Sequence, residues 1–379
     1  MLILYNPPSS AGRKPILPMS LLALGSILEG RREYRIIDGN LTVDPLEALD
    51  SAIKQTGARW LGVTVMPGPQ LQNAVPVCRE LHHRHPGLKI IWGGYFPTQH
   101  FDACLHDPAV DFVARGHAEF AFSDLLDRLE AGSEPVFLPG IAFRSTATGE
   151  IVDGGLAPLP DPRELPTLFP YHRVEVERYV RKTFLGSRTL PHHSSYGCPF
   201  FCNFCAVVNM VEGRWKPQTA AQIAEVVRYL VNHWNVNAVE FDDNNFFTQE
   251  ERIAEFCEQV MDLQISWWGE ARIDTLLKFS ERTWGLMRDA GLKMVFLGAE
   301  SGSDETLRRM NKGGKASTEK TLEIARKMRD YGIIPEMSFV LGNPPEPESD
   351  TRATIEFIRR VKQANPATEI IMYMYTPVP

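Results

Sequence analysis

Residues 196–205 are Tyr196-Gly197-Cys198-Pro199-Phe200-Phe201-Cys202-Asn203-Phe204-Cys205, a C-x3-C-x2-C triplet with aromatic residues in its gaps. No fourth cysteine lies nearby. Cys thiolates hold iron–sulfur clusters, normally four thiolates for a four-iron cluster. Three ligands in one short loop would therefore leave one iron free for a ligand that is not part of the protein. An open metal position is typical of a catalytic rather than a structural site.

Other uses of the cysteines are open. A structural zinc site would want a fourth Cys or His at a typical spacing, and the nearest histidines, His192 and His193, lie upstream without a paired arrangement. A disulfide with one spare thiol is less expected, because nothing at the N-terminus resembles a signal peptide and cytosolic thiols stay reduced. Cys78, Cys104 and Cys257 stand alone in apolar or helical stretches, so we expect them to be buried and inert.

The triplet, with the aromatic Phe204 just before its last cysteine, resembles the hallmark of the radical SAM superfamily. The resemblance implies that Cys198, Cys202 and Cys205 hold a [4Fe-4S] cluster, and that the amino and carboxylate groups of S-adenosylmethionine chelate the fourth iron. It also implies reductive cleavage of S-adenosylmethionine to a 5′-deoxyadenosyl radical, with an electron donor of the flavodoxin or ferredoxin type. Phe204 would pack beside the adenine.

The first 140 residues alternate between short apolar runs and helical patterns. The runs lie at 1–8, 34–38, 60–65, 89–94 and 112–116, and helical patterns include 21–28 and 74–84. Strands that alternate with helices predict an α/β domain, here a doubly wound, Rossmann-like parallel sheet covered on both faces. Ligands of such sheets bind beyond the carboxyl ends of the strands.

This order resembles the N-terminal cobalamin-binding domain of many radical SAM proteins. Three segments carry the resemblance: Asn6-Pro7-Pro8, Gly93-Gly94-Tyr95-Phe96-Pro97-Thr98, and Arg115-Gly116-His117-Ala118-Glu119. The resemblance implies a cobalamin site that includes Pro7, Thr64, Gly93, Gly94, Thr98 and Gly116. An empty, vestigial domain is the alternative, since a glycine pair after a strand also suits a tight turn. The D-x-H-x-x-G signature of a lower axial histidine is missing, so we expect no histidine ligand on the lower face.

Residues 141–185 contain many prolines and little periodicity, which predicts a linker. The second domain is then expected at 186–379. After the cysteine strand, strand patterns lie at 238–247, 266–272, 293–302, 336–344 and 369–375. These six β/α repeats predict a partial, TIM-like (β/α)6 barrel, and barrel catalysis is built at the carboxyl ends of the strands.

Polar residues follow several of these strands. An ionised carboxylate can accept two ribose hydroxyls, and Glu300, in G-x-E-S-G, resembles the family's position near the ribose. Arg272 is expected to pair with the methionyl carboxylate, and Ser338 to lie beside the nucleoside. The alternatives are a capping box or salt bridge for Glu300 and a surface ion pair for Arg272. Asp242 and Asp243 either contact substrate or cofactor, or cap the next helix.

Composition limits the partners. The chain has 379 residues, a formal charge of −7 and no apolar run of the roughly 18 residues that span a bilayer. An acidic balance argues against nucleic acid as a partner. We therefore expect a cytoplasmic enzyme with a small-molecule substrate. Relatives usually continue beyond the last residues, 375–379, so we expect a fragment or a truncated chain.

The resemblance as a whole implies a cobalamin-dependent radical SAM enzyme, most often one that methylates an unactivated carbon. The first alternative is a reaction without methyl transfer, such as ring contraction or the oxidative cyclisation catalysed by the anaerobic magnesium-protoporphyrin monomethyl ester cyclase. A methylthiotransferase acting on RNA is disfavoured, because its additional N-terminal cysteine triplet and basic terminal domain are not visible. An alternative from another functional class is an iron–sulfur redox sensor or electron-transfer module. That function would leave the positions of Glu300 and Arg272 at strand ends unexplained.

Overall fold

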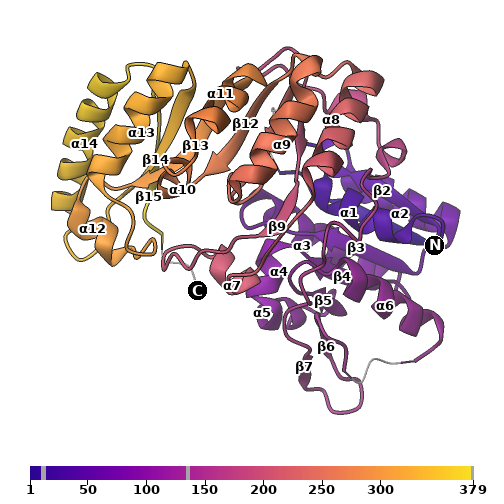
Figure 1. The fold of residues 1–379 in the computed structure, drawn as a ribbon. Coiled ribbons are helices and arrows are strands. Elements are labelled where there is room, and N and C mark those ends of the chain that lie inside the picture. The colour runs from indigo at the N-terminus through magenta and orange to yellow at the C-terminus, as the bar shows by residue number, and fades with distance from the viewer. Residues whose placement is uncertain (10–13, 134–136, 377–379) are drawn as a thin grey trace. The chain divides into compact units, whose positions relative to one another are not determined.

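The computed structural model describes residues 1–9, 14–133 and 137–376, and it divides into two compact units, Met1–Tyr179 and Val180–Pro379. Figure 1 shows both units along the chain. Residues 377–379, at the chain end noted above, lie outside the described residues.

The first unit is built on a seven-stranded sheet in the order β2-β1-β3-β4-β5-β6-β7. Its parallel strands are β1 (Leu2–Asn6), β2 (Tyr34–Asp38), β3 (Trp60–Thr64), β4 (Lys89–Gly93) and β5 (Phe112–Ala114). Its helices are α1 (Met19–Leu28), α2 (Pro45–Thr56), α3 (Pro69–Arg84), α4 (Tyr95–Gln99), α5 (Phe101–Leu105) and α6 (Glu119–Glu130). The order 2-1-3-4-5 is a doubly wound arrangement whose ligands bind where the strand order reverses, between β1 and β3.

Helices cover both faces of this sheet. Ile3 and Tyr5 of β1 pack in one core with α2, α3 and α5, whereas Leu2 and Leu4 pack in the other with α1 and α6. Strands buried on both faces are apolar throughout, rather than alternating apolar with polar residues. The predicted parallel α/β sheet is confirmed.

Two strands that we did not predict extend the sheet. β6 (Ile141–Arg144) pairs antiparallel with β5, and β7 (Ile151–Asp153) pairs antiparallel with β6. Both lie in the range that we expected to be a linker. They escaped prediction because they are only four and three residues long, too short to show a period of two.

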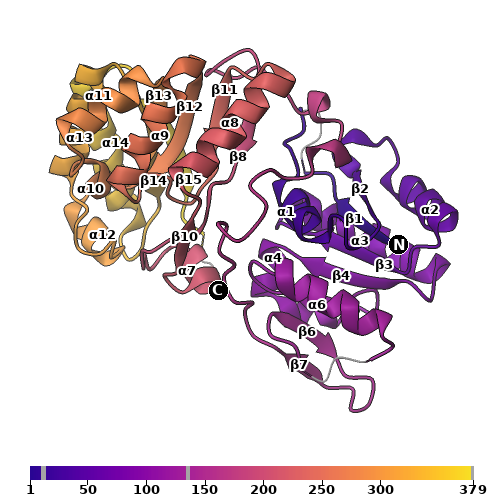
Figure 2. The same cartoon turned by 45° about the vertical axis from the view of Figure 1, so that its right-hand side comes forward.

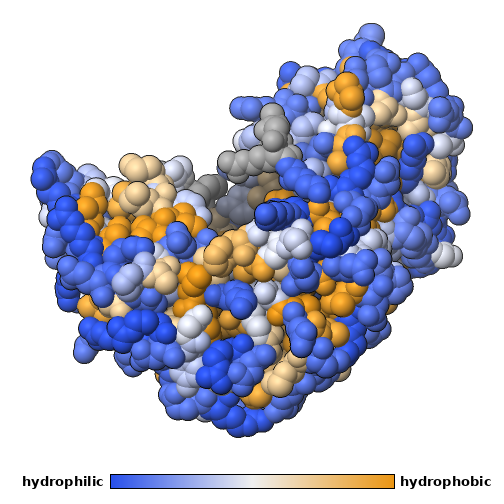
Figure 3. Space-filling model, turned by 90° about the horizontal axis from the view of Figure 1, so that it is seen from above, coloured by the Kyte–Doolittle hydropathy of each residue, from blue (hydrophilic) through white to orange (hydrophobic). Residues whose placement is uncertain are grey.

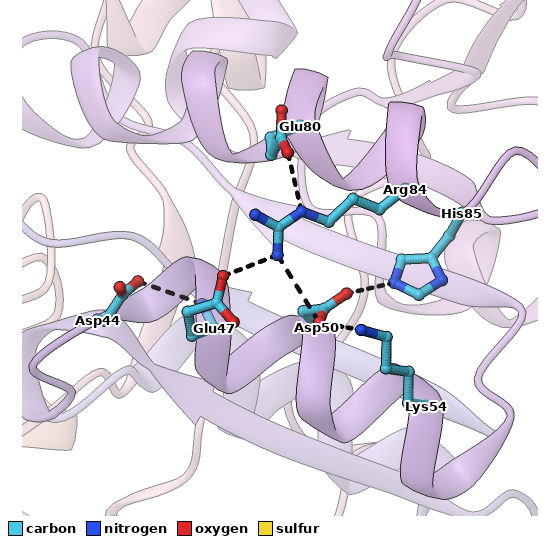
Figure 4. Close-up of polar contacts among 7 residues, drawn as sticks. All are labelled: Asp44, Glu47, Asp50, Lys54, Glu80, Arg84 and His85. Atoms are coloured by element: carbon cyan, nitrogen blue, oxygen red, sulfur yellow. Dashed lines mark hydrogen bonds and ion pairs between the residues drawn. The ribbon is translucent and has the colours of Figure 1, made fainter.

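Figure 4 shows an ion-pair network that joins α2 to α3. Asp50 is buried on α2, accepts a hydrogen bond from Lys54 Nζ at 2.6 Å and lies 2.8 Å from His85 Nε2. Arg84 donates to Glu47 at 2.7 Å. Because Asp50 and Glu47 of α2 contact Arg84 of α3, the network stabilises the packing of the two helices.

The second unit is built on a six-stranded parallel sheet in the order β15-β14-β13-β12-β11-β8. Its strands are β8 (Thr189–His192), β11 (Ala238–Phe241), β12 (Ser266–Ala271), β13 (Leu292–Glu300), β14 (Ile334–Leu341) and β15 (Glu369–Met374). Its helices are α7 (Val207–Val211), α8 (Ala220–Trp234), α9 (Glu250–Val260), α10 (Ile273–Leu276), α11 (Glu281–Asp289), α12 (Asp304–Arg309), α13 (Thr318–Tyr331) and α14 (Pro347–Ala364). From β11 to β15, neighbouring strands are also consecutive in the chain, with helices between them (Figure 2). The predicted partial (β/α)6 barrel is confirmed.

A separate two-stranded antiparallel sheet carries the cysteine loop. β9 (Ser195–Gly197) pairs with β10 (Trp215–Pro217), and the loop runs between them. The first barrel strand is therefore β8, which ends three residues before β9 begins.

Among the described residues, no helix combines the length and the apolar character that crossing a membrane requires. The face drawn in Figure 3 is largely hydrophilic, with hydrophobic residues scattered across it. The large apolar side chains that are exposed include Met372, Tyr373 and Met374 of β15.

Adjacent tryptophans of β12 point to opposite faces of the barrel sheet. Trp267 is fully buried between the sheet and its helices, where its ring lies 5.8 Å from Phe247 and 5.5 Å from Phe256, centroid to centroid. Its Nε1 donates to the carbonyl of Ala290 at 3.0 Å. Trp268 is only partly buried on the other face. Such alternation follows from the two-residue period of a strand.

We therefore expect Trp267→Ala to destabilise the protein by about 3–5 kcal/mol, the range for a large aromatic side chain removed from a core. Trp268→Ala should lower the free energy of unfolding by less than about 2 kcal/mol, because part of that ring is already in contact with water. Urea unfolding followed by circular dichroism measures both. Equal losses for the two neighbours would contradict this assignment of the two faces.

Candidate active site

The cysteine loop is closed at its base by the β9–β10 hairpin. Cys198 N donates to the carbonyl of Arg214 at 3.0 Å, and Cys205 N donates to the carbonyl of Cys202 at 3.2 Å. All six cysteines of the chain are free thiols, and the three in the loop are half-buried. The other three, Cys78, Cys104 and Cys257, are buried as expected.

The environment of the loop suits metal-bound thiolates. Burial, and then the neighbouring cysteines, raise the pKa of the Cys198 and Cys205 thiols above the usual value. Such thiols deprotonate when iron binds them, since the metal supplies the compensating positive charge. No group of three or more His, Cys, Asp or Glu side chains in residues 1–9, 14–133 and 137–376 is placed to hold a single metal ion. That the three loop thiols hold a cluster stays a prediction.

Arg272 lies beside this loop. It is buried at the end of β12, and its Nη1 donates to Cys202 Sγ at 3.2 Å. Its Nε donates to Asp274 at 2.9 Å and its Nη2 donates to the carbonyl of Lys312 at 2.6 Å. The exposed ion pair that we kept as an alternative is therefore wrong: the pair with Asp274 exists, but it is buried. The expected contact with the methionyl carboxylate stays a prediction.

Glu300 ends β13 with a positive φ of 66°, a strained conformation for a residue other than glycine. Its side chain is buried and accepts from Lys312 Nζ at 2.8 Å. Lys312 also donates to the carbonyl of Gly298 at 2.7 Å. The salt-bridge alternative for Glu300 is thus present, and the expected contact with a ribose stays a prediction. The sequence analysis missed Lys312, which lies in a loop and has no periodic pattern to mark it.

Gly298 and Ser338 are register partners on β13 and β14. A Cβ added at Gly298 would lie 2.2 Å from Glu300 Oε1 and 2.6 Å from Lys312 Nζ, so only glycine leaves room for this ion pair. Ser338 is buried beside it. The expected SAM contacts Glu300 and Ser338 therefore lie on adjacent strands, Glu300 at the end of β13 and Ser338 within β14, opposite Gly298. Phe204 is half-buried in the cysteine loop.

A buried polar cluster fixes the segment that leads into the cysteine loop. Asp243 accepts hydrogen bonds from Ser194 N at 3.0 Å, from Ser194 Oγ at 2.9 Å and from Ser195 Oγ. Arg252 donates to Ser194 Oγ and to the carbonyl of Gln218 at 3.0 Å. Asp243 does not cap the following helix, so that alternative is wrong for this residue. The sequence gives little hint of this cluster, because its members lie up to 58 residues apart.

His192, one of the two upstream histidines that we considered for zinc, is buried. Its Nε2 lies 2.9 Å from Gln218 Oε1. Burial lowers its pKa to about 4, so it is neutral at physiological pH.

The face of the barrel sheet that carries Trp268 is acidic. Burial, and then Glu240, raise the pKa of Asp242 to about 7, although part of its surface remains exposed. Burial, and then Asp242, raise the pKa of Glu270 to about 7. Glu336 also has a raised pKa and accepts from Trp268 Nε1 at 2.7 Å. Three carboxyl groups with raised pKa values, those of Asp242, Glu270 and Glu336, therefore belong to this sheet.

In the first unit, the expected cobalamin residues lie at the ends of β1, β3, β4 and β5. Gly94 has a φ of 99°, and an added Cβ there would lie 3.1 Å from both the nitrogen and the oxygen of Val65. Gly116 N donates to Thr98 Oγ1 at 2.9 Å, and Thr98 Oγ1 donates to the carbonyl of Gly94 at 2.7 Å. The buried Thr98 therefore joins two glycines that follow strands β4 and β5, and the missing Cβ of Gly94 allows the close approach of the Val65 backbone. Gly93 is half-buried.

The end of β1 and the start of α3 add two further contacts to this crevice, which sequence reasoning missed. Gln70 donates to Asn6 Oδ1 at 2.8 Å, and Met66 N donates to Gln70 Oε1 at 2.9 Å. Pro7 is buried and Thr64 is half-buried at this edge. The buried amides hold the two strand ends on either side of the point where the strand order reverses.

Two family models match the chain. The model of the radical SAM superfamily matches residues 193–358, and the model of the B12 binding domain matches residues 13–126. The first range contains the three cysteines of the loop together with Arg272, Glu300 and Ser338.

Two curated relatives are similar over most of this chain. An uncharacterised methyltransferase of Pyrococcus horikoshii is 23% identical over 368 residues, which cover 95% of this chain and 78% of that protein. The anaerobic magnesium-protoporphyrin IX monomethyl ester cyclase of Synechocystis sp. is 27% identical over 347 residues, which cover 88% of this chain and 67% of that protein.

A solved structure has the same fold. The cobalamin-dependent S-adenosylmethionine radical enzyme OxsB, with aqua-cobalamin and S-adenosylmethionine bound, matches with a TM-score of 0.82 at 20% identity. The match covers 98% of this chain and 53% of that chain, so this chain spans about half of OxsB.

The raised pKa of Glu270 has a consequence for stability. The folded state keeps a proton on Glu270 that the unfolded state releases above its usual pKa of 4.5. Stability is therefore fully present below that value and is lost as the pH rises toward 7. We expect Glu270→Gln to leave stability unchanged near pH 4.5 and to raise it near pH 8 by on the order of 2 kcal/mol, after discounting for partial solvent exposure.

Urea unfolding at the two pH values measures this difference. Glu255→Gln is the matched control, because Glu255 is exposed on α9 outside the acidic interior. A pH dependence that is the same in Glu270→Gln as in the unsubstituted protein would contradict the prediction.

Proposed function

Because the chain belongs to the radical SAM superfamily and carries a B12 binding domain, we propose that it is a cobalamin-dependent radical SAM enzyme. When bound, the cluster and S-adenosylmethionine supply a 5′-deoxyadenosyl radical, and cobalamin supplies a route for methyl transfer. The proposed reaction is methylation of an unactivated carbon in a small-molecule substrate. The similarity to a methyltransferase of Pyrococcus horikoshii supports this choice.

The observation that carries the proposal is the meeting of the cysteine loop with polar strand ends. Arg272 at the end of β12 touches Cys202, and Arg272 also touches Lys312, which pairs with Glu300 at the end of β13. A cluster with an open iron would thus sit beside residues able to bind hydroxyls and a carboxylate. An electron-transfer module has no use for these strand-end groups.

We propose specific roles for this chain's residues. Cys198, Cys202 and Cys205 hold the cluster. Glu300 orients the ribose, since a carboxylate accepts from both hydroxyls. Lys312 holds the Glu300 carboxylate in position through their buried ion pair, in which Nζ lies 2.8 Å from Oε1.

Further residues complete the proposed cosubstrate and cofactor sites. Ser338 lies beside the nucleoside, and Phe204 packs on the adenine. In the first unit, Pro7, Thr64, Gly93, Gly94, Thr98 and Gly116 would border cobalamin.

We further propose that residues 1–140 form the cobalamin-binding domain, that 141–185 lead from it, and that 186–379 form the radical SAM barrel. Radical SAM enzymes need a reductant. We propose a donor of the flavodoxin or ferredoxin type, and a cytoplasmic location where such donors occur.

Anaerobic reconstitution tests the proposed cluster. Each of Cys198→Ala, Cys202→Ala and Cys205→Ala should lower iron and sulfide content and abolish 5′-deoxyadenosine release under strong reductant, because two thiolates do not retain the cluster. Cys257→Ala, at a buried thiol on α9, is the control and should keep both. Release of 5′-deoxyadenosine by any of the three loop variants would refute the assignment.

A second candidate is an oxidative reaction without methyl transfer, favoured by the 27% identity to the Synechocystis cyclase. The two candidates differ in their products. Methyl transfer should yield S-adenosylhomocysteine together with 5′-deoxyadenosine, whereas oxidative cyclisation yields 5′-deoxyadenosine alone. Chromatography of the reaction mixture measures both nucleosides. Release of 5′-deoxyadenosine without S-adenosylhomocysteine, in the presence of cobalamin and substrate, would exclude the methyltransferase proposal.

A further inference from the structure

The guanidinium of Arg272 is held by three different groups. Nε donates to Asp274 Oδ1 at 2.9 Å, Nη2 donates to the carbonyl of Lys312 at 2.6 Å, and Nη1 donates to Cys202 Sγ at 3.2 Å. The guanidinium carbon also lies 4.1 Å from the ring centre of Phe200, in the same loop as Cys202. A planar fork held on each of its nitrogens has little freedom to rotate. The N–H that points at the sulfur is therefore fixed before any cosubstrate binds.

We infer that Arg272 raises the reduction potential of the cluster by donating a hydrogen bond to Cys202 Sγ, and so eases the one-electron reduction that S-adenosylmethionine cleavage requires. This inference rests on the proposed function in one respect only, namely that the three cysteines hold the cluster. Arg272 acts through Cys202 and is a positioning and tuning residue.

The direction of the shift in reduction potential follows from the negative charge of the cluster and its thiolates. Reduction adds one electron to a cluster whose three thiolates are already negative, so a nearby cation or hydrogen-bond donor stabilises the reduced state more than the oxidised state. The reduction potential of an iron–sulfur cluster depends on its net charge, on hydrogen bonds to its sulfurs and on its exposure to solvent. Arg272 is buried, and a low local dielectric strengthens the interaction.

The other charged groups around Arg272 do not cancel this effect. Asp274 offsets part of the guanidinium charge, but it contacts Nε, whereas Nη1 faces the sulfur. The ammonium of Lys312 is paired with Glu300. The directional N–H bond to Cys202 therefore remains after the nearby ion pairs are taken into account.

This role differs from the one that the sequence predicts for Arg272, a partner for the methionyl carboxylate. A carboxylate partner would affect the affinity for S-adenosylmethionine and leave the potential of the cosubstrate-free cluster unchanged. A hydrogen bond to Cys202 would change that potential with no cosubstrate present. The two roles can therefore be separated by measuring both quantities.

The experiment uses the reconstituted full chain without S-adenosylmethionine. Potentiometric titration with dithionite as the reductant, followed by electron paramagnetic resonance of the reduced cluster, gives the midpoint potential. We expect Arg272→Gln to shift the midpoint to a more negative value. Arg272→Lys should shift it less in the same direction, because it keeps the charge but loses the fork. Arg228→Gln, which removes an exposed arginine on α8 paired with Asp262, should cause no shift.

Midpoint potentials that agree among the unsubstituted protein and both Arg272 variants would overturn the inference. A weaker affinity for S-adenosylmethionine in the same variants would then support the carboxylate role instead. If Arg272→Gln binds no cluster, the midpoint potential of Arg272→Lys is compared with that of the unsubstituted protein. Equal values would then overturn the inference. Unsubstituted protein that takes up no cluster would refute the three-cysteine site, and with it both the proposed function and this inference. An unchanged potential in cluster-loaded protein refutes the inference alone.

Discussion

The cysteine loop depends on one buried carboxylate, that of Asp243. An unpaired charge in a protein interior is strongly unfavourable, so a fully buried Asp243 requires close donors, and two consecutive serines before the loop supply them. Arg252, on α9, donates to the carbonyl and the Oγ of Ser194, and although burial lowers its pKa to about 10, it remains a cation at neutral pH. The strand that enters the loop is thereby tied to the end of β11, which fixes where the three sulfurs begin.

The carboxyl groups of the barrel differ in their partners and in their pKa values. Near the loop the carboxylates are paired, since Asp243 has its serines and Glu300 has Lys312. The pKa values of Asp242 and Glu270 are instead raised to about 7, chiefly by burial. A carboxyl that is protonated can donate as well as accept a hydrogen bond. The carboxylates of Asp243 and Glu300 are therefore held by fixed partners, whereas the hydrogen bonding of Asp242 and Glu270 changes with their protonation near neutral pH.

The sequence predicted those features that rest on short, local patterns. The cysteine spacing, the alternation of strands and helices, and strand ends such as Glu300 are visible within a few residues. It did not predict contacts between distant segments: Arg272 and Cys202 are 70 residues apart, and no local pattern shows that this arginine faces a sulfur. Short strands were also missed, because β7 has three residues and its neighbours are rich in proline. Thr98 was chosen for its place after a strand, and the structure adds that its hydroxyl joins two backbone segments.

Lys312 explains why the two halves of the candidate site are coupled. Its carbonyl accepts from Arg272, which touches Cys202, and its ammonium binds Glu300 and the carbonyl of Gly298. One residue thus joins the sulfur side of the site to the side expected to hold the ribose. The chain from Cys202 through Arg272 and Lys312 to Glu300 consists of hydrogen bonds of 2.6–3.2 Å between buried or partly buried groups, and buried polar groups that are all satisfied make a site rigid.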